Sequence, residues 1–483
     1  MCNKFKNLIS NNRLLERENK EEDVNLAIGS DRGRIIFSAP FRRLQKKAQV
    51  FPLETNGAIR SRLTHSLEVA HLGMYIAEKI LSTKDLKLTF LHKNSFAFTT
   101  LVENACLMHD LGNPPFGHFG EKAIKDWFNK NETEFKEMLG AEKKDEKKVC
   151  EFFENEYLDF TEFDGNPQGL RIVTKLQGND GKSGLNLTFS QLASYLKYVK
   201  PPNEFDKKQP FQKKPGYFLS EKDLVEKMWE NLCMKKSQRY PLVYIMEAAD
   251  DLAYCMSDIE DGIEKNIINW KQFEDGMTRI WEKKTKNGKV DLLKDLFGYA
   301  NDETRKTRIT ELISFKTKLN NDLVAFSAKR FVDNIKEILD GKASSIFNEG
   351  SDERLILDAL KEFTRKNLFR SLEAENIELA GYAVISGILD HLKPLLICSK
   401  EDFNAIKEYK TDAPGIGKTD LHRRLFHRLP DSYVFSYEAA ICSEADKFKE
   451  WFYRAHLIVD YVSGMTDQYA LETYQLLSGI TVG

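Results

Sequence analysis

The chain has 483 residues, of which 41% are hydrophobic and 30% are charged, a balance typical of a folded globular protein and one that excludes wholesale disorder. Its 72 lysines and arginines against 74 aspartates and glutamates give a net charge of −2, which excludes a uniformly basic nucleic-acid-binding surface but permits a local basic pocket. The seven cysteines are an odd number without a C-x-x-C pair, which argues against a disulfide framework or a zinc ribbon.

Residues 1–29 are polar and begin with a charged segment instead of the apolar stretch of a signal peptide, so we expect an N-terminal extension. No apolar run approaches the roughly 20 residues that a membrane helix needs, which predicts a cytoplasmic protein without a membrane partner. From residue 30 the pattern is mostly helical, with no βαβ alternation. We predict an all-α fold with a core at 30–265, a charged insertion near 130–157, and a helical C-terminal region at 266–483.

The histidines are concentrated in the first part of this core. Only nine are present, yet five lie between residues 65 and 118, where an even spread would place about one. Thr64 is a plausible N-cap for a helix that carries His65 on its apolar stripe. The other members of this stripe follow at helical spacing: Val69, Leu72, Ile76 and Ile80.

Two further helices follow this one. The second carries an apolar stripe from Phe98 to His109, and it must end near the Gly-Asn-Pro-Pro sequence at 112–115, because glycine breaks a helix and proline cannot continue it. A third helix is predicted at about 117–129.

Histidines and carboxylates fall on the apolar stripes of several of these helices. A lone histidine such as His65 is more often a packed core residue than a ligand. The second helix, however, ends in His109-Asp110, and a helix after Pro241 places Asp250 on its own stripe. Buried carboxylates need a partner, and a cation is an efficient one. Two imidazoles and two carboxylates suit Mn²⁺ or Mg²⁺, with Fe, Co or Zn²⁺ as alternatives.

Longer strings around these residues resemble those of a known family, the HD-superfamily deoxyguanosine triphosphate triphosphohydrolases. The strings are 30–36, 49–54, 62–66, 108–120, 245–251 and 463–467. The resemblance is strong over about 30–265 and weaker over 365–483, and it implies an HD-type helical core. It also implies four metal ligands, which are His65, His109, Asp110 and Asp250.

The same resemblance identifies His118 and Glu121 as a catalytic pair. Their i, i+3 spacing puts both side chains on one helix face. His118 would protonate the leaving nucleoside oxygen or organise the attacking water, and Glu121 would fix its tautomer and charge. Many HD proteins carry another histidine where this chain has Asn113, so a second catalytic imidazole is not expected there.

Substrate contacts are implied in several segments of the chain. Lysines interleaved with aromatic residues at 195–201 and 213–217 have a composition that fits either a solvated basic loop or a phosphate site. Tyr254 and Asp258 follow Asp250 at i+4 and i+8, which stacks a ring and a hydroxyl acceptor beside the ligand, although core packing is the alternative for the tyrosine. The complete set implied by the resemblance is Gln49, Asn166, Lys197, Tyr198, Lys214, Tyr254, Asp258 and, as a guanine-reading carboxylate, Glu378.

The reaction implied by the resemblance is attack of metal-activated water at the α-phosphorus of dGTP, which releases deoxyguanosine and intact triphosphate and so controls dNTP pools. One alternative is a broader-specificity HD-domain deoxynucleotide phosphohydrolase, and another is a non-catalytic nucleotide or nucleic-acid sensor. The resemblance further implies a homo-oligomer, a hexamer or a tetramer, and single-stranded nucleic acid as a regulator.

Overall fold

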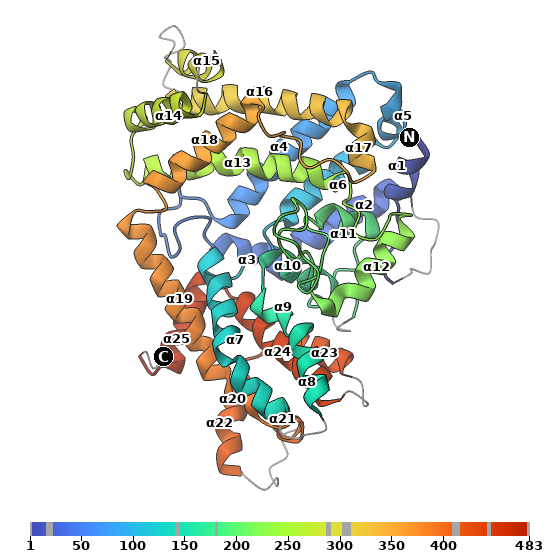
Figure 1. The fold of residues 1–483 in the computed structure, drawn as a ribbon, viewed down its shortest axis with the longest axis vertical. Helices are drawn as coiled ribbons and strands as arrows, with labels where there is room; N and C mark the ends of the chain where they lie inside the picture. Colours follow the sequence, from blue (N-terminus) through green and yellow to red (C-terminus); the bar gives the residue numbers. More distant parts are fainter. Residues whose placement is uncertain are drawn as a thin grey trace.

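The structure is a computed structural model that describes residues 2–15, 23–140, 145–178, 182–285, 291–301, 311–407, 416–441 and 446–480. The all-α expectation is confirmed: these ranges contain helices and no strand, apart from two isolated bridges, Arg13 with Thr188 and Ala48 with Ser61 (Figure 1). In the same ranges no helix combines the length and the apolar character needed to cross a bilayer.

The described residues of the N-terminal part pack on the core. This part contains α1 (Cys2–Leu8) and the start of α2 (Val24–Ile36). Phe5 is buried, and the Arg13 guanidinium donates to the buried carboxylate of Asp31 at 2.5 Å. The polar composition of 1–29 therefore concealed a few anchoring residues.

Three long helices meet at the centre of the molecule: α4 (Arg62–Ser82), α6 (Ser95–Met108) and α13 (Val243–Glu264). The predicted stripe of α4 is buried against the other two helices. The N-cap of α4 is Ser61 and not Thr64, which instead occupies N3 of a capping box, with each side chain accepting the other's backbone N–H.

The helix α7 (Gly117–Leu139) begins directly after the 112–115 turn and runs about ten residues beyond the predicted end. Its extra turns bury Phe135 and Leu139, and the Phe135 ring lies 5.0 Å from that of Trp451 on α24 (Lys447–Ser463). Tertiary packing therefore extends a helix whose local sequence is strongly charged.

The helical C-terminal region is divided between the two ends of the molecule (Figure 1). One group packs on α4 and α13, and its members are α14 (Trp270–Lys284), α15 (Asp291–Ala300), α16 (Glu311–Asp333), α17 (Ile335–Leu339) and α18 (Asp352–Asn367). The other packs on α7 through α19 and α24, and its members are α19 (Leu372–Leu392), α20 (Pro394–Ile397), α21 (Lys400–Lys407), α22 (Ile416–Phe426), α23 (Asp431–Ala440), α24 and α25 (Asp467–Leu477).

Shorter elements complete the core between these groups. They are α3 (Ala39–Arg43), η1 (Leu44–Lys46), η2 (Leu86–Leu88), α5 (Thr89–Lys93), α8 (Glu146–Glu154), α9 (Leu158–Thr161), α10 (Gly165–Thr174), α11 (Phe189–Tyr195), η4 (Leu219–Glu221) and α12 (Lys222–Asn231).

Candidate metal and nucleotide site

Three of the four predicted metal ligands lie together where α4, α6 and α13 meet. His65 comes from α4, His109 caps the C-terminus of α6, and Asp250 comes from α13. Nε2 of His65 and Nε2 of His109 lie 3.4 and 3.5 Å from Oδ1 of Asp250. Among the residues that the structure describes, this trio forms the one group of histidine, cysteine, aspartate and glutamate side chains whose ligand atoms could share a metal ion.

The His109 ring is oriented as a metal ligand should be. Its Nδ1 donates to the carbonyl oxygen of Cys106 at 2.7 Å, which fixes the proton on that nitrogen. Its Nε2 is buried, has no hydrogen-bond partner and faces Asp250. A lone pair directed into a cluster of carboxylates fits a divalent cation, since burying it without a partner is otherwise costly.

Asp110, the fourth predicted ligand, lies beside this trio. Its Oδ1 is 3.6 Å from Nε2 of His109, and its Oδ2 accepts a hydrogen bond from Arg62 at 2.8 Å. Burial acts to raise the pKa of Asp110, but the charges of Arg62, His109 and His65 outweigh it and hold the pKa at about 2. The pKa of Asp250 is likewise well below its usual range, because Lys197 and the two histidines outweigh burial. Both carboxylates are thus ionised at neutral pH.

His118 and Glu121 face each other on the first turn of α7. Nδ1 of His118 lies 2.9 Å from Oε2 of Glu121, while Oε1 of Glu121 accepts the backbone N–H of Gly165 at 2.9 Å. The glutamate is buried, whereas the side chain of His118 is 81% exposed at the rim. Burial acts to raise the pKa of Glu121, but the His118 hydrogen bond and the charges of His118 and Lys214 hold it at about 2.

A cavity of about 530 Å³ opens over the trio and this pair. Of the residues predicted for the site, thirteen line it: Gln49, His65, His109, Asp110, His118, Glu121, Asn166, Lys197, Tyr198, Lys214, Asp250, Tyr254 and Glu378. Asp258 does not line the cavity. It lies fully buried one turn beyond Tyr254 on α13, where burial raises its pKa to about 8.

The two predicted lysines approach the cavity from different directions. Lys197, just after α11, places Nζ 3.3 Å from Oδ2 of Asp250. Lys214 places Nζ 2.6 Å from Oδ2 of Asp164, the N-cap of α10. Each ammonium group is therefore held next to a carboxylate at the wall of the cavity, one near the metal cluster and one near Glu121.

The lining of the cavity also includes aromatic residues and a carboxylate from the C-terminal half of the chain. The Tyr254 ring lies 6.5 Å from that of Phe369, and Glu378 reaches in from α19. Oε1 of Gln49 is buried without a hydrogen-bond partner. An unpaired amide oxygen in a cavity wall is a position where a ligand hydroxyl would be stabilised.

Sequence reasoning missed several lining or supporting residues. Arg62, which holds Asp110, had a signal: it stands three residues before His65, and charge is rare at a buried helix position. Lys361 on α18 donates to Asp251 at 2.7 Å and lines the cavity, but nothing in its local sequence distinguishes it from a surface lysine.

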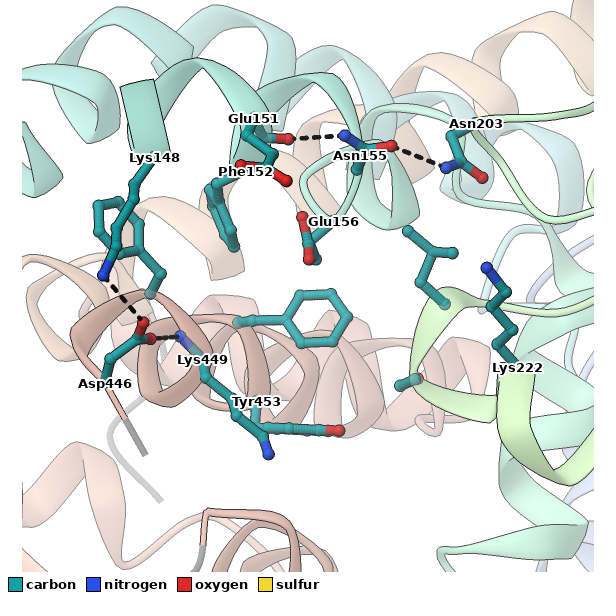
Figure 2. Close-up of a pocket in the computed structure, with 14 residues that line it drawn as sticks. Lys148, Glu151, Phe152, Asn155, Glu156, Asn203, Lys222, Asp446, Lys449 and Tyr453 are labelled. Carbon is teal, nitrogen blue, oxygen red and sulfur yellow. Dashed lines mark hydrogen bonds and ion pairs between the residues drawn. The ribbon is translucent and has the colours of Figure 1, made fainter. Parts of the chain in front are cut away.

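A second cavity, of about 910 Å³, lies between α8, η4 and α24 and shares no lining residue with the first (Figure 2). Charges of both signs surround it: Lys148 faces Asp446 at 3.9 Å, and Glu156 points toward its middle. It contains none of the predicted site residues.

Comparison with known proteins places these observations in context. A model of the HD domain matches residues 62–172, and a model of the phosphohydrolase-associated domain matches residues 419–476. The chain is 38% identical to "Deoxyguanosinetriphosphate triphosphohydrolase" of Yersinia pestis (strain Pestoides F), over 98% of both chains. It is equally similar, over the same shares, to the protein of that name in Yersinia pseudotuberculosis serotype O:3 (strain YPIII).

Proposed function

The chain belongs to the deoxyguanosinetriphosphate triphosphohydrolases, a family of HD-domain enzymes, and from this premise we propose that it hydrolyses dGTP to deoxyguanosine and inorganic triphosphate. The observation that carries the proposal is one cavity in which a metal-ligand cluster, an acid–base pair and two lysines converge. This combination suits water attack on a polyanionic phosphoryl group.

A divalent cation at His65, His109, Asp110 and Asp250 would polarise a phosphoryl oxygen and lower the pKa of bound water. We propose Mn²⁺ or Mg²⁺ as this ion, with Fe, Co or Zn²⁺ as alternatives that the mixed nitrogen and oxygen ligands also accept. The buried, unpaired Nε2 of His109 supports its role as a ligand.

The proposed reaction balances without a further reactant. The oxygen of water bonds to the α-phosphorus, the proton that the water loses returns through solvent to His118, and the bond between that phosphorus and O5′ of the deoxyribose breaks. O5′ leaves as the 5′-hydroxyl of deoxyguanosine, and the water oxygen remains in the triphosphate. His118 would supply the proton to O5′ through Nε2, because its Nδ1 is hydrogen-bonded to Glu121.

The triphosphate would lie along Asn166, Lys197, Tyr198 and Lys214. A nucleoside triphosphate carries about four negative charges, and charge-assisted hydrogen bonds from lysine are among the stronger polar contacts. The deoxyribose would lie against the Tyr254 ring with its 3′-hydroxyl near Gln49, and Glu378 would accept hydrogen bonds from guanine. Asp258 does not line the cavity, so it would contribute indirectly, by holding the position of Tyr254.

We place this activity in the cytoplasm, where it would control dNTP pools, and we propose a homo-oligomer, a hexamer or a tetramer, with single-stranded nucleic acid as a regulator. An exposed apolar surface next to the cavity supports self-association: Leu372 and Leu379 on α19 are 74% and 67% exposed. Regulation by nucleic acid is supported by the family resemblance alone.

The test of the proposed function is to incubate the enzyme with each of the eight common nucleoside triphosphates and Mn²⁺ or Mg²⁺, and to identify the products. We expect deoxyguanosine and triphosphate from dGTP. Comparable turnover of all four dNTPs would favour the broader-specificity alternative. Release of pyrophosphate or orthophosphate would contradict the proposal, and binding without any product would favour a sensor.

Replacement of Lys214 by methionine is expected to lower kcat/KM for dGTP by about 10- to 100-fold, because one charge-assisted hydrogen bond is worth about 1.5–3 kcal/mol. Steady-state kinetics at fixed ionic strength measure the change. The matched control is Lys213→Met, which removes the same charge from an exposed neighbour that does not line the cavity. Equal losses in the two variants would show that Lys214 contributes only general electrostatic attraction.

A further inference from the structure

The turn that joins Asp110 to α7 has an unusual backbone. Phe116, its last residue, and Gly117, the first residue of α7, have φ angles of +61° and +56°. A left-handed conformation is unfavourable for a non-glycine residue and persists only where surrounding contacts hold it. Phe116 is also the N-cap of α7 and makes no side-chain capping bond. The geometry of His118, two residues later, therefore depends on support from outside the turn.

That support comes from Asp467, the first residue of α25. Its Oδ1 accepts the backbone N–H of Phe116 at 2.9 Å, and its Oδ2 accepts the backbone N–H of Ala48 at 2.8 Å. Asp467 is only 3% exposed. A single carboxylate thus joins the turn before His118 to Ala48, the residue before Gln49. It does so from a position 351 residues after Phe116.

Lys47 links the same three segments a second time. Its Nζ donates to the carbonyl oxygen of Asn113 at 2.5 Å and to that of Ser463, at the end of α24, at 2.9 Å. Asn113 in turn donates from its side chain to Oδ1 of Asp110. Both ends of the turn are therefore tied to the C-terminal helices, one through Lys47 and one through Asp467.

The C-terminal helices also support Glu121 indirectly, through α10. Asp460 on α24 pairs with Arg171 on α10 at 2.8 Å, with both side chains buried. The first residue of α10 is Gly165, whose N–H donates to Glu121. The segment matched by the phosphohydrolase-associated domain thus contacts the turn before His118, through Asp467, and the helix α10 that binds Glu121, through Asp460.

From these contacts we propose that Asp467 and Lys47 are positioning residues for the reaction, through which the C-terminal helices fix His118 relative to the metal ligands. This inference rests on the proposed function. Neither side chain touches the substrate in this proposal. Both act by setting the turn between Asp110 and His118, because a displacement of about 1 Å in a catalytic group costs roughly 100-fold in rate.

Asp467→Asn tests the inference with an isosteric side chain. Its Nδ2 would face a backbone N–H, so one of the two hydrogen bonds is lost. We expect kcat to fall by about 10- to 100-fold, with KM for the nucleotide and the affinity for Mn²⁺ each within about 3-fold of wild type. The matched control is Glu450→Gln, which alters a carboxylate of α24 that is just as buried but pairs with Arg454 and Tyr437, away from the turn.

Lys47→Met provides a second test, since it keeps the length of the side chain and removes its two hydrogen bonds. The same selective loss of kcat is expected, and the double variant should lose less than the product of the two single losses. All variants are measured at a temperature where circular dichroism shows them folded.

Wild-type kcat in Asp467→Asn and Lys47→Met would overturn the inference. Losses of kcat that match the loss of folded protein, or that equal the loss in Glu450→Gln, would also overturn it. The nucleotide panel on the wild-type enzyme decides the proposed function separately, because the kcat comparison can be made with whichever nucleotide the enzyme hydrolyses.

Discussion

Replacement of His109 by alanine is expected to lower dGTP turnover by at least about 100-fold, because even residues that only support a metal ligand typically cost 10- to 100-fold when they are removed. The hydrogen bond from Nδ1 to the carbonyl of Cys106 orients the ring of His109. The alanine variant therefore lacks an oriented ligand and leaves the carboxylates of Asp110 and Asp250 without the imidazole that lies beside them. Treatment of the wild type with a chelator should abolish turnover, and added Mn²⁺ should restore it.

A thermal readout separates loss of metal from loss of fold. Because an ion that binds the folded state alone stabilises it by mass action, Mn²⁺ should raise the Tm of the wild type and leave that of His109→Ala unchanged. His71→Ala is the control, since His71 is an exposed histidine on α4 that stacks on Tyr75 outside the cavity. A His109→Ala variant with wild-type activity, or with an undiminished Tm response to Mn²⁺, would refute its role as a ligand.

The second large effect is expected at the His118–Glu121 pair. General acid–base groups contribute about 10²–10⁴-fold, so His118→Ala should lower kcat by an amount in this range while Mn²⁺ affinity is retained. Glu121→Gln should lower kcat by a smaller factor, because the imidazole remains but loses the carboxylate that orients it. Lys122→Ala is the matched control, because Lys122 is exposed on the same turn and pairs with Asp126.

The pH dependence of the Glu121→Gln deficit is a separate expectation. The pKa of Glu121 is depressed from 4.5 to about 2, so the carboxylate is ionised at every pH above its ordinary value and gains a proton only as the pH falls toward 2. The wild type should therefore remain more active than Glu121→Gln at every pH between 6 and 9, because the carboxylate that orients His118 stays ionised throughout this range. Equal rates of the two enzymes at the acidic end of this range would contradict an ionised Glu121 there.

The meeting of the three candidate metal ligands could be anticipated because the local sequence around each one indicates its position on a helix. His65 and Asp250 are at apolar-stripe positions, and His109 is placed by the glycine and prolines that end its helix. The roles proposed for His118, Glu121 and the substrate contacts come from the family resemblance, because periodicity alone leaves them open.

The contacts of Lys361 and Asp467 could not be predicted in this way, because they join residues across long separations in the sequence. Lys361 pairs with Asp251 from 110 residues away, and Asp467 reaches Ala48 from 419 residues away. Local patterns carry no information about such pairs. The length of α7 and the anchoring of 2–15 were missed for a related reason: each depends on a few buried contacts within a polar local sequence.

The most direct measurement of the central claim is hydrolysis of dGTP in ¹⁸O-labelled water, with the products examined by ³¹P NMR and mass spectrometry. Attack at the α-phosphorus predicts triphosphate that carries one ¹⁸O atom at a terminal phosphate, together with unlabelled deoxyguanosine. Label in the 5′-hydroxyl of deoxyguanosine, or formation of dGMP with pyrophosphate or of dGDP with orthophosphate, would contradict it.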